Sequence, residues 1–146
     1  MLSLPIPLET AVFLAGLGQL ALVAGSLAIP RVLDWRADIA QLRPLTRQVF
    51  WTYAGYIWCT NLCFGLVSTF GPAWLLDRSP LATAVTAYIA LYWAARVLIQ
   101  FVYFDRSHVP PGPLPKIGEV ALVSLFVVLT LTYGAAAFAN LERRAG

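Results

Sequence analysis

The chain has 146 residues, of which 60% are hydrophobic and 12% are charged, and its mean hydropathy is +0.74. A soluble domain carries about 25% charged residues, so the composition excludes an ordinary soluble protein and predicts an all-α integral membrane protein. The formal net charge of +3 comes from scattered basic residues and not from a basic run. We therefore expect membrane lipids as partners and no nucleic acid.

Four apolar segments reach the roughly 20 residues that a helix needs to cross about 30 Å of hydrocarbon. They cover residues 8–29, 46–70, 81–104 and 116–140, and proline-containing stretches bound them. The sequence therefore predicts a four-transmembrane-helix bundle that makes up a single membrane domain over residues 1–146.

The first segment, residues 8–29, is expected to remain in the protein as a membrane span. A cleaved signal peptide is the alternative, but the segment has no basic region before it, begins near Glu9 and has too long an apolar run. The segment has a face of small residues, formed by Gly16, Gly18 and Gly25, along which another helix can pack closely. Such a face would also serve a homo-oligomer or a larger membrane complex.

The first loop, residues 31–43, is patterned like a short amphipathic helix. Its apolar residues recur at helical spacing and its charged residues occupy other faces, the apolar set being Val32, Trp35, Ile39 and Leu42. We expect an interfacial helix here, with Trp35 at the depth of the lipid headgroups. The simpler interpretation is that the charges only fix the direction of membrane insertion.

The second segment, residues 46–70, contains both cysteines of the chain, Cys59 and Cys63, one helical turn apart. Buried cysteines usually act as small hydrophobic side chains, which is the role expected here, although a thiol redox role is the alternative. His108 is the only histidine and lies in a proline-rich loop. We therefore predict no metal site and no cofactor.

The third segment, residues 81–104, carries a stripe of polar residues in its C-terminal half. The members of the stripe recur at spacings of four, four and three residues, which places them on one helix face: Tyr92, Arg96, Gln100 and Tyr103. Glu119, at the start of the fourth segment, is the predicted counter-ion of Arg96. Gln19 and Asn61 are further buried amides that would extend the hydrogen-bonded network.

Orientation follows from the basic residues of the two sides. The first and third loops share one side and contain Arg31, Arg36, Arg43, Arg47, Arg106 and Lys116, against Arg78, Arg143 and Arg144 on the other. Because basic loops are retained in the cytoplasm, we expect a multi-pass protein of the plasma or inner membrane with both termini non-cytoplasmic.

Two functions are compatible with this pattern. The first is a non-catalytic lipid-binding or accessory bundle, in which buried polar residues hold the helices together. The second is a membrane enzyme or carrier that binds a hydrophobic substrate with an anionic or carbonyl head at Arg96. The candidate ligand-binding residues are Arg96, Gln100, Tyr92, Tyr103 and Glu119; a filled bundle with Arg96 paired to Glu119 would favour the first function, and a cavity beside Arg96 the second. Whether the protein is an enzyme is left open.

Overall fold

The computed structural model describes residues 5–105, 107 and 111–145, without the side chains of Arg143 and Arg144. The expectations for Arg106 and His108 fall outside these residues. All regular structure in the described part is helical, as the sequence predicts. The elements are α1 (Leu8–Ser26), α2 (Ile29–Val32), α3 (Trp35–Ala40), α4 (Pro44–Phe70), α5 (Pro72–Leu75), α6 (Pro80–Val102) and α7 (Pro113–Ala145).

Three helical stretches in the described part of the chain are long and apolar enough to cross a membrane: Leu8–Val32, Pro80–Val102 and Pro113–Glu142. Helix α4 has the length, with 27 residues, but not the same apolar character. Its first turns carry Arg47 and Gln48, and its middle is rich in tyrosine and tryptophan. The protein is therefore an all-helical membrane protein with three clear spans and a more polar fourth long helix.

Prolines mark where the long helices begin. Pro44 and Pro80 occupy the first turns of α4 and α6, where the missing N–H costs nothing. At α6 the hydroxyl of Ser79 also accepts a hydrogen bond from the amide of Ala82 at 3.0 Å, which caps the helix. The prolines that precede these apolar segments in the sequence therefore mark the first turns of the helices.

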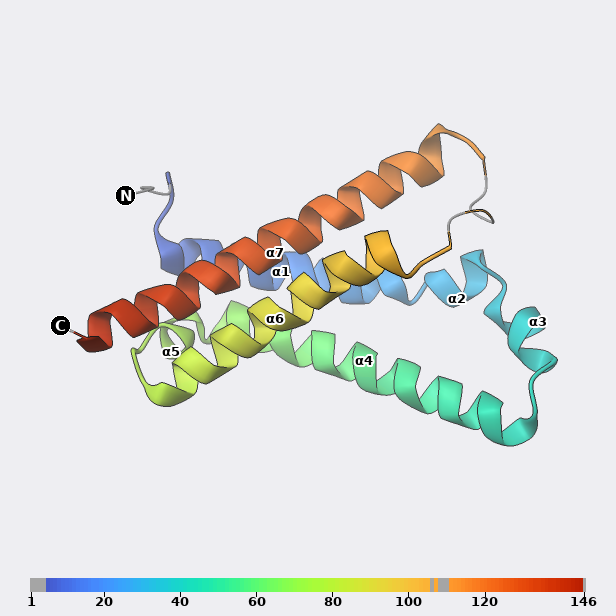
Figure 1. The fold of residues 1–146 in the computed structure, drawn as a ribbon, viewed down its shortest axis with the longest axis horizontal. Coiled ribbons are helices and arrows are strands. Elements are labelled where there is room, and N and C mark those ends of the chain that lie inside the picture. The colour runs from blue at the N-terminus through green and yellow to red at the C-terminus, as the bar shows by residue number, and fades with distance from the viewer. Residues whose placement is uncertain (1–4, 106, 108–110, 146) are drawn as a thin grey trace.

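The four long helices form two antiparallel pairs (Figure 1). Helix α1 packs along α4, α6 packs along α7, and contact between α1 and α7 joins the pairs. The chain termini and α5 lie at one end of the bundle, here called the terminal end. Helices α2 and α3 and the α6–α7 connection lie at the other, the loop end. Toward the loop end, α4 and α6 run apart (Figure 1).

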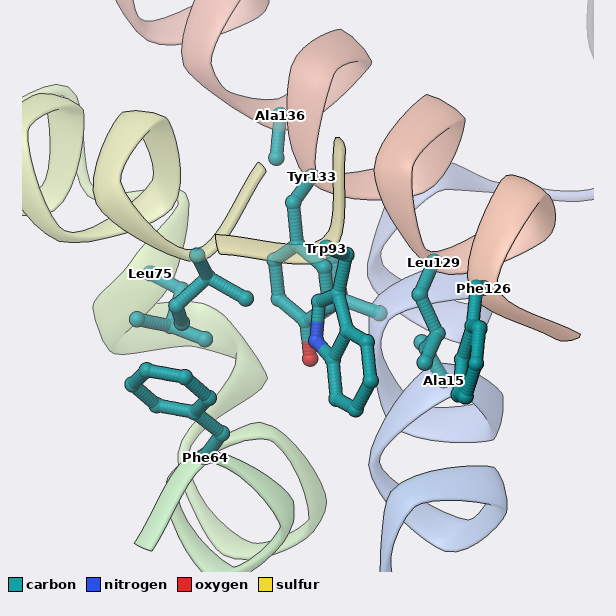
Figure 2. Packing of buried hydrophobic residues seen from close by; sticks show 10 residues of the cluster. Ala15, Phe64, Leu75, Trp93, Phe126, Leu129, Tyr133 and Ala136 are labelled. Atoms are coloured by element: carbon teal, nitrogen blue, oxygen red, sulfur yellow. The ribbon is translucent and has the colours of Figure 1, made fainter. Parts of the chain in front are cut away.

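The buried core lies where all four long helices meet. Its residues come from α1, α4, α5, α6 and α7, and most are shown in Figure 2: Val12, Ala15, Phe64, Leu75, Ile89, Trp93, Phe126, Leu129, Tyr133 and Ala136. Gly16 brings α1 against the α4 backbone, since a Cβ atom there would lie 2.7 Å from the amide nitrogen of Thr69. Of the three glycines predicted to form a packing face, Gly16 therefore serves α1–α4 packing, whereas Gly18 faces Leu125 of α7 and nothing lies within 4 Å of a Cβ atom at Gly25.

The first loop does not form one continuous helix over residues 31–43. It is divided into α2 and α3 at Asp34, whose φ of 49° places it in the left-handed region. The break rotates the two parts relative to each other, so Ile39 is buried while Val32 stays 78% exposed. The helical spacing in the sequence was therefore correct for α3 and wrong across Asp34.

Candidate functional site

The polar stripe on α6 is present but shorter than predicted. Tyr92, Arg96 and Gln100 follow one another along the helix and are all half-buried. Tyr103 is the C-terminal cap residue of α6 and is 81% exposed. The structure therefore brings three of the four stripe residues into the bundle and leaves Tyr103 at the surface of the loop end.

The guanidinium of Arg96 is held by aromatic rings. Its Cζ atom lies 5.2 Å from the ring centroid of Phe104 and 5.6 Å from that of Phe126 on α7. Both distances lie within the roughly 6 Å over which an aromatic face attracts a cation. The rings orient the charge but leave its N–H donors available for hydrogen bonds, because an aromatic face is not a conventional acceptor.

Glu119 has a different position from the one predicted. Its carboxylate accepts a hydrogen bond from the Gln100 amide at 3.4 Å. Within the described residues it forms no ion pair with Arg96. The predicted Arg96–Glu119 pair is therefore not found, because Gln100 is one turn nearer to the start of α7 along the antiparallel α6–α7 pair.

Asn61 of α4 lies on the other side of the stripe, beside Tyr92. Its Oδ1 atom is buried and has no hydrogen-bond partner within the described structure. The ring of Tyr92 also packs edge-on against Phe64 of α4, with centroids 5.2 Å apart. The stripe thus connects α4 to α7 and contains two groups with unused hydrogen-bonding capacity, the guanidinium of Arg96 and the carbonyl oxygen of Asn61.

A second polar group lies deeper, at the centre of the core, and consists of Gln19, Ser68, Trp93 and Tyr133. We call it the central knot. The amide nitrogen of Gln19 donates to the Tyr133 hydroxyl at 2.5 Å, and the Trp93 indole donates to the Gln19 carbonyl oxygen at 3.1 Å. Ser68 and Tyr133 form a further hydrogen bond between their hydroxyls. Each residue comes from a different long helix, and each is at most 1% exposed.

The central knot changes the role expected for Gln19. The sequence indicated a buried amide there, but as part of a network around Arg96, whereas the structure connects it to Trp93 and Tyr133. Sequence reasoning missed Ser68 and Tyr133. The available signal was weak, because Ser68 and Tyr133 are two of several hydroxyl-bearing residues in their segments; a buried hydroxyl in a membrane span requires a partner, but the sequence does not show which one is buried.

The two cysteines contribute to neither polar group. Cys59 and Cys63 are free thiols, and both are exposed on the outer side of α4. Among the described residues, no three His, Cys, Asp or Glu side chains gather as a metal site would require. The groups of the stripe that can accept or donate further hydrogen bonds are the Asn61 Oδ1 atom and the Arg96 guanidinium.

No family model, no curated protein and no solved structure matches this chain.

Proposed function

We propose that the protein is a four-span membrane bundle that binds an amphiphile with an anionic or carbonyl head at Arg96, without catalysing its conversion. The fourth span is α4. At about 1.5 Å per residue its 27 residues extend about 40 Å, enough to cross a bilayer. It packs against α1, which is long and apolar enough to cross a membrane, and exposes Tyr56 and Ile57 as a membrane-facing helix would.

The proposed orientation places the loop end in the cytoplasm and both termini on the other side. Most basic residues belong to the loop end, including Arg31, Arg36 and Arg43 around α2 and α3. These two short helices would then lie at the cytoplasmic interface. Single cysteines at Ser107 and Ala145 in a cysteine-free background test this orientation. An impermeant reagent added to intact cells should label only the Ala145→Cys variant; labelling of Ser107→Cys alone would reverse the assignment.

The binding proposal depends on one observation: Arg96 is half-buried in the bundle and its charge faces rings instead of a carboxylate. Arg96 lies six residues before the end of α6 at Val102, which is about 9 Å along the helix. A charged side chain at the centre of a span costs about 2.5 kcal/mol or more. An anionic head would offset that cost by forming charge-assisted hydrogen bonds with the guanidinium.

The neighbours of Arg96 suit the same ligand. Asn61 offers a buried acceptor with no partner on the α4 side, which can take a hydrogen bond from a hydroxyl of the head. In this proposal the head approaches the stripe between α4 and α6, which run apart toward the loop end (Figure 1) and whose rings meet where Phe64 contacts Tyr88 and Tyr92. Acyl chains would then remain in the bilayer while the head reaches the stripe.

Native mass spectrometry of the protein in a mild detergent, with added dioleoyl phosphatidylglycerol, tests this proposal. Loss of charge-assisted hydrogen bonds at Arg96 corresponds to at least about a tenfold loss of affinity. We expect that loss in Arg96→Met. The matched control is Arg47→Met, which removes an exposed arginine near the start of α4. Equal lipid retention by wild type and Arg96→Met would refute the proposal.

A further inference from the structure

A cavity of about 510 Å³ lies at the loop end, far along the chain from the Arg96 stripe. It occupies the corner where α1 passes into α2 and where α3 turns toward α4, and we call it the corner cavity. Its lining is Leu27, Pro30, Arg31, Asp34, Arg36 and Trp51. Its volume is within the range of about 300–1,000 Å³ that small-molecule sites occupy.

The charged groups of the corner cavity are not used by the fold. Asp34 precedes α3 at the position where an aspartate normally caps a helix, yet its side chain makes no capping hydrogen bond. Within the described part of the chain, Asp34 forms no ion pair with Arg31 or Arg36. Two cations and one anion therefore line the same cavity, and all three can bind a ligand.

The aromatic wall of the cavity is part of a cluster of three contacting rings. Trp51 packs edge-on against Phe50, with ring centroids 5.6 Å apart, and lies 6.4 Å from Trp35 of α3. Trp35 in turn packs edge-on against Phe50 at 5.3 Å. These three rings pack α3 against the first turns of α4, so Arg36 of α3 and Trp51 of α4 line the same cavity from two helices.

We propose that the corner cavity binds the zwitterionic aminoalkyl phosphate head of a phospholipid. The phosphate would be held by the guanidinium groups of Arg31 and Arg36, and the ammonium by the carboxylate of Asp34 and the face of Trp51. Leu27 continues this wall toward the apolar part of α1, where the acyl chains would start. A purely anionic head would satisfy the arginines but place its charge close to Asp34.

This inference goes beyond the Arg96 site, because no lining residue belongs to α6 or α7. The test is titration by native mass spectrometry with three probes: dihexanoyl phosphatidylethanolamine, dihexanoyl phosphatidylglycerol and free O-phosphoethanolamine. Titrations of wild type and of Arg96→Met are compared, so that lipid bound at Arg96 is not counted. We expect phosphatidylethanolamine to bind at least about tenfold more tightly than either other probe, since it alone has both head charges and acyl chains.

The substitution Asp34→Asn gives the sharpest outcome. Asparagine tolerates the left-handed backbone as aspartate does, so the corner should keep its shape. We expect about tenfold weaker phosphatidylethanolamine binding and equal or tighter phosphatidylglycerol binding, because the repelling carboxylate is gone. Arg31→Gln and Arg36→Gln should weaken both lipids, whereas the control Arg43→Gln, outside the lining, should change neither.

Three results would overturn the inference. Tighter binding of phosphatidylethanolamine by Asp34→Asn would mean that Asp34 does not hold the ammonium. Equal binding of both lipids by Arg96→Met, which lacks the other proposed lipid site, would mean that the cavity does not distinguish the two heads by their amine. Free O-phosphoethanolamine binding as tightly as the lipid would identify a soluble ligand in place of a phospholipid. If the Arg96 proposal alone fails, the phosphatidylethanolamine titration of Arg96→Met is unaffected, so the two failures are distinguishable.

Discussion

The two ends of the bundle differ in how their polar groups are satisfied. At the terminal end, α5 closes the bundle, and the Asn140 amide donates to the Leu75 carbonyl at 2.9 Å while accepting from the Arg78 amide at 3.2 Å. The central knot borders this end and is completely buried. At the loop end, α4 and α6 run apart, and Arg96, Arg31 and Arg36 have no carboxylate partner among the described residues (Figure 1).

This difference indicates which polar residues serve folding and which are available for ligands. A buried polar group in a span costs free energy unless it is hydrogen-bonded, and Gln19 and Tyr133 meet that requirement within the protein. Arg96 and Asn61 do not meet it within the described structure. Substitutions at the terminal end should therefore lower the stability of the protein, whereas substitutions at the loop end should weaken ligand binding.

The largest effect is expected from Gly16→Leu. A Cβ atom at Gly16 would lie 2.7 Å from the Thr69 amide nitrogen and 2.9 Å from the Ser68 carbonyl carbon, which are backbone atoms that cannot move aside. We expect a loss of about 3 kcal/mol in the free energy of unfolding, measured in a mild detergent. Gly25→Leu is the control, since nothing lies within 4 Å of its Cβ position. Similar losses in both variants would show that α1 does not approach α4 through Gly16.

The second effect concerns the central knot. Tyr133→Phe removes the hydroxyl that joins Gln19 to Ser68 and leaves two buried groups without this partner. We expect the free energy of unfolding to fall by about 2 kcal/mol. Tyr103→Phe removes a hydroxyl from a residue that is 81% exposed and should change stability little. A stable Tyr133→Phe protein would mean that the knot contributes nothing to folding.

The third prediction separates the knot from the stripe by double-mutant cycles. Arg96→Met and Glu119→Gln should be nearly additive, with a coupling energy below about 0.5 kcal/mol, because the two side chains form no ion pair in the described structure. The reference cycle is Gln19→Leu with Tyr133→Phe, which should couple by about 1 kcal/mol since these side chains are hydrogen-bonded. A strong coupling between Arg96 and Glu119 would restore the ion pair predicted from the sequence.

The smallest expected effect is a change in the pKa of an aspartate. Two similar turns, one at each end of the bundle, contain Asp77 and Asp105. Hydrogen bonds from Ser79 hold the pKa of Asp77 below its ordinary value of 3.8, and Ser107 does the same for Asp105. In each turn the serine amide donates to the aspartate, at 2.8 Å and 2.9 Å. Because these folded-state pKa values are lowered, the stabilisation is present above pH 3.8 and is lost as the pH falls through the lowered pKa.

Carboxyl chemical shifts followed by NMR during an acid titration measure both values. In Ser79→Ala the pKa of Asp77 should rise toward 3.8, while the pKa of Asp105 should stay unchanged. A pKa of Asp77 that does not respond would exclude the Ser79 hydroxyl as the cause and leave the backbone amide of residue 79, which alanine keeps. Both turns lie outside the spans, so the titration also compares the aspartate pKa values at the two ends of the bundle outside the membrane.

Composition and local pattern alone were sufficient to predict the all-helical membrane class and the places where the helices begin. Both are local properties: apolar length sets the ability to span a bilayer, and a proline such as Pro44 or Pro80 can begin a helix but not continue one. The polar stripe over Tyr92, Arg96 and Gln100 follows from helical spacing for the same reason.

Only the tertiary structure decided which polar residues meet. Gln19, Ser68, Trp93 and Tyr133 are separated by up to 114 residues along the chain, and their meeting depends on which helices are neighbours and on their relative rotation. The same factors pair Glu119 with Gln100 instead of Arg96. The break at Asp34 is likewise not visible in the helical spacing of the sequence: its left-handed backbone separates α2 from α3, and Trp35 of α3 packs edge-on against Phe50 of α4.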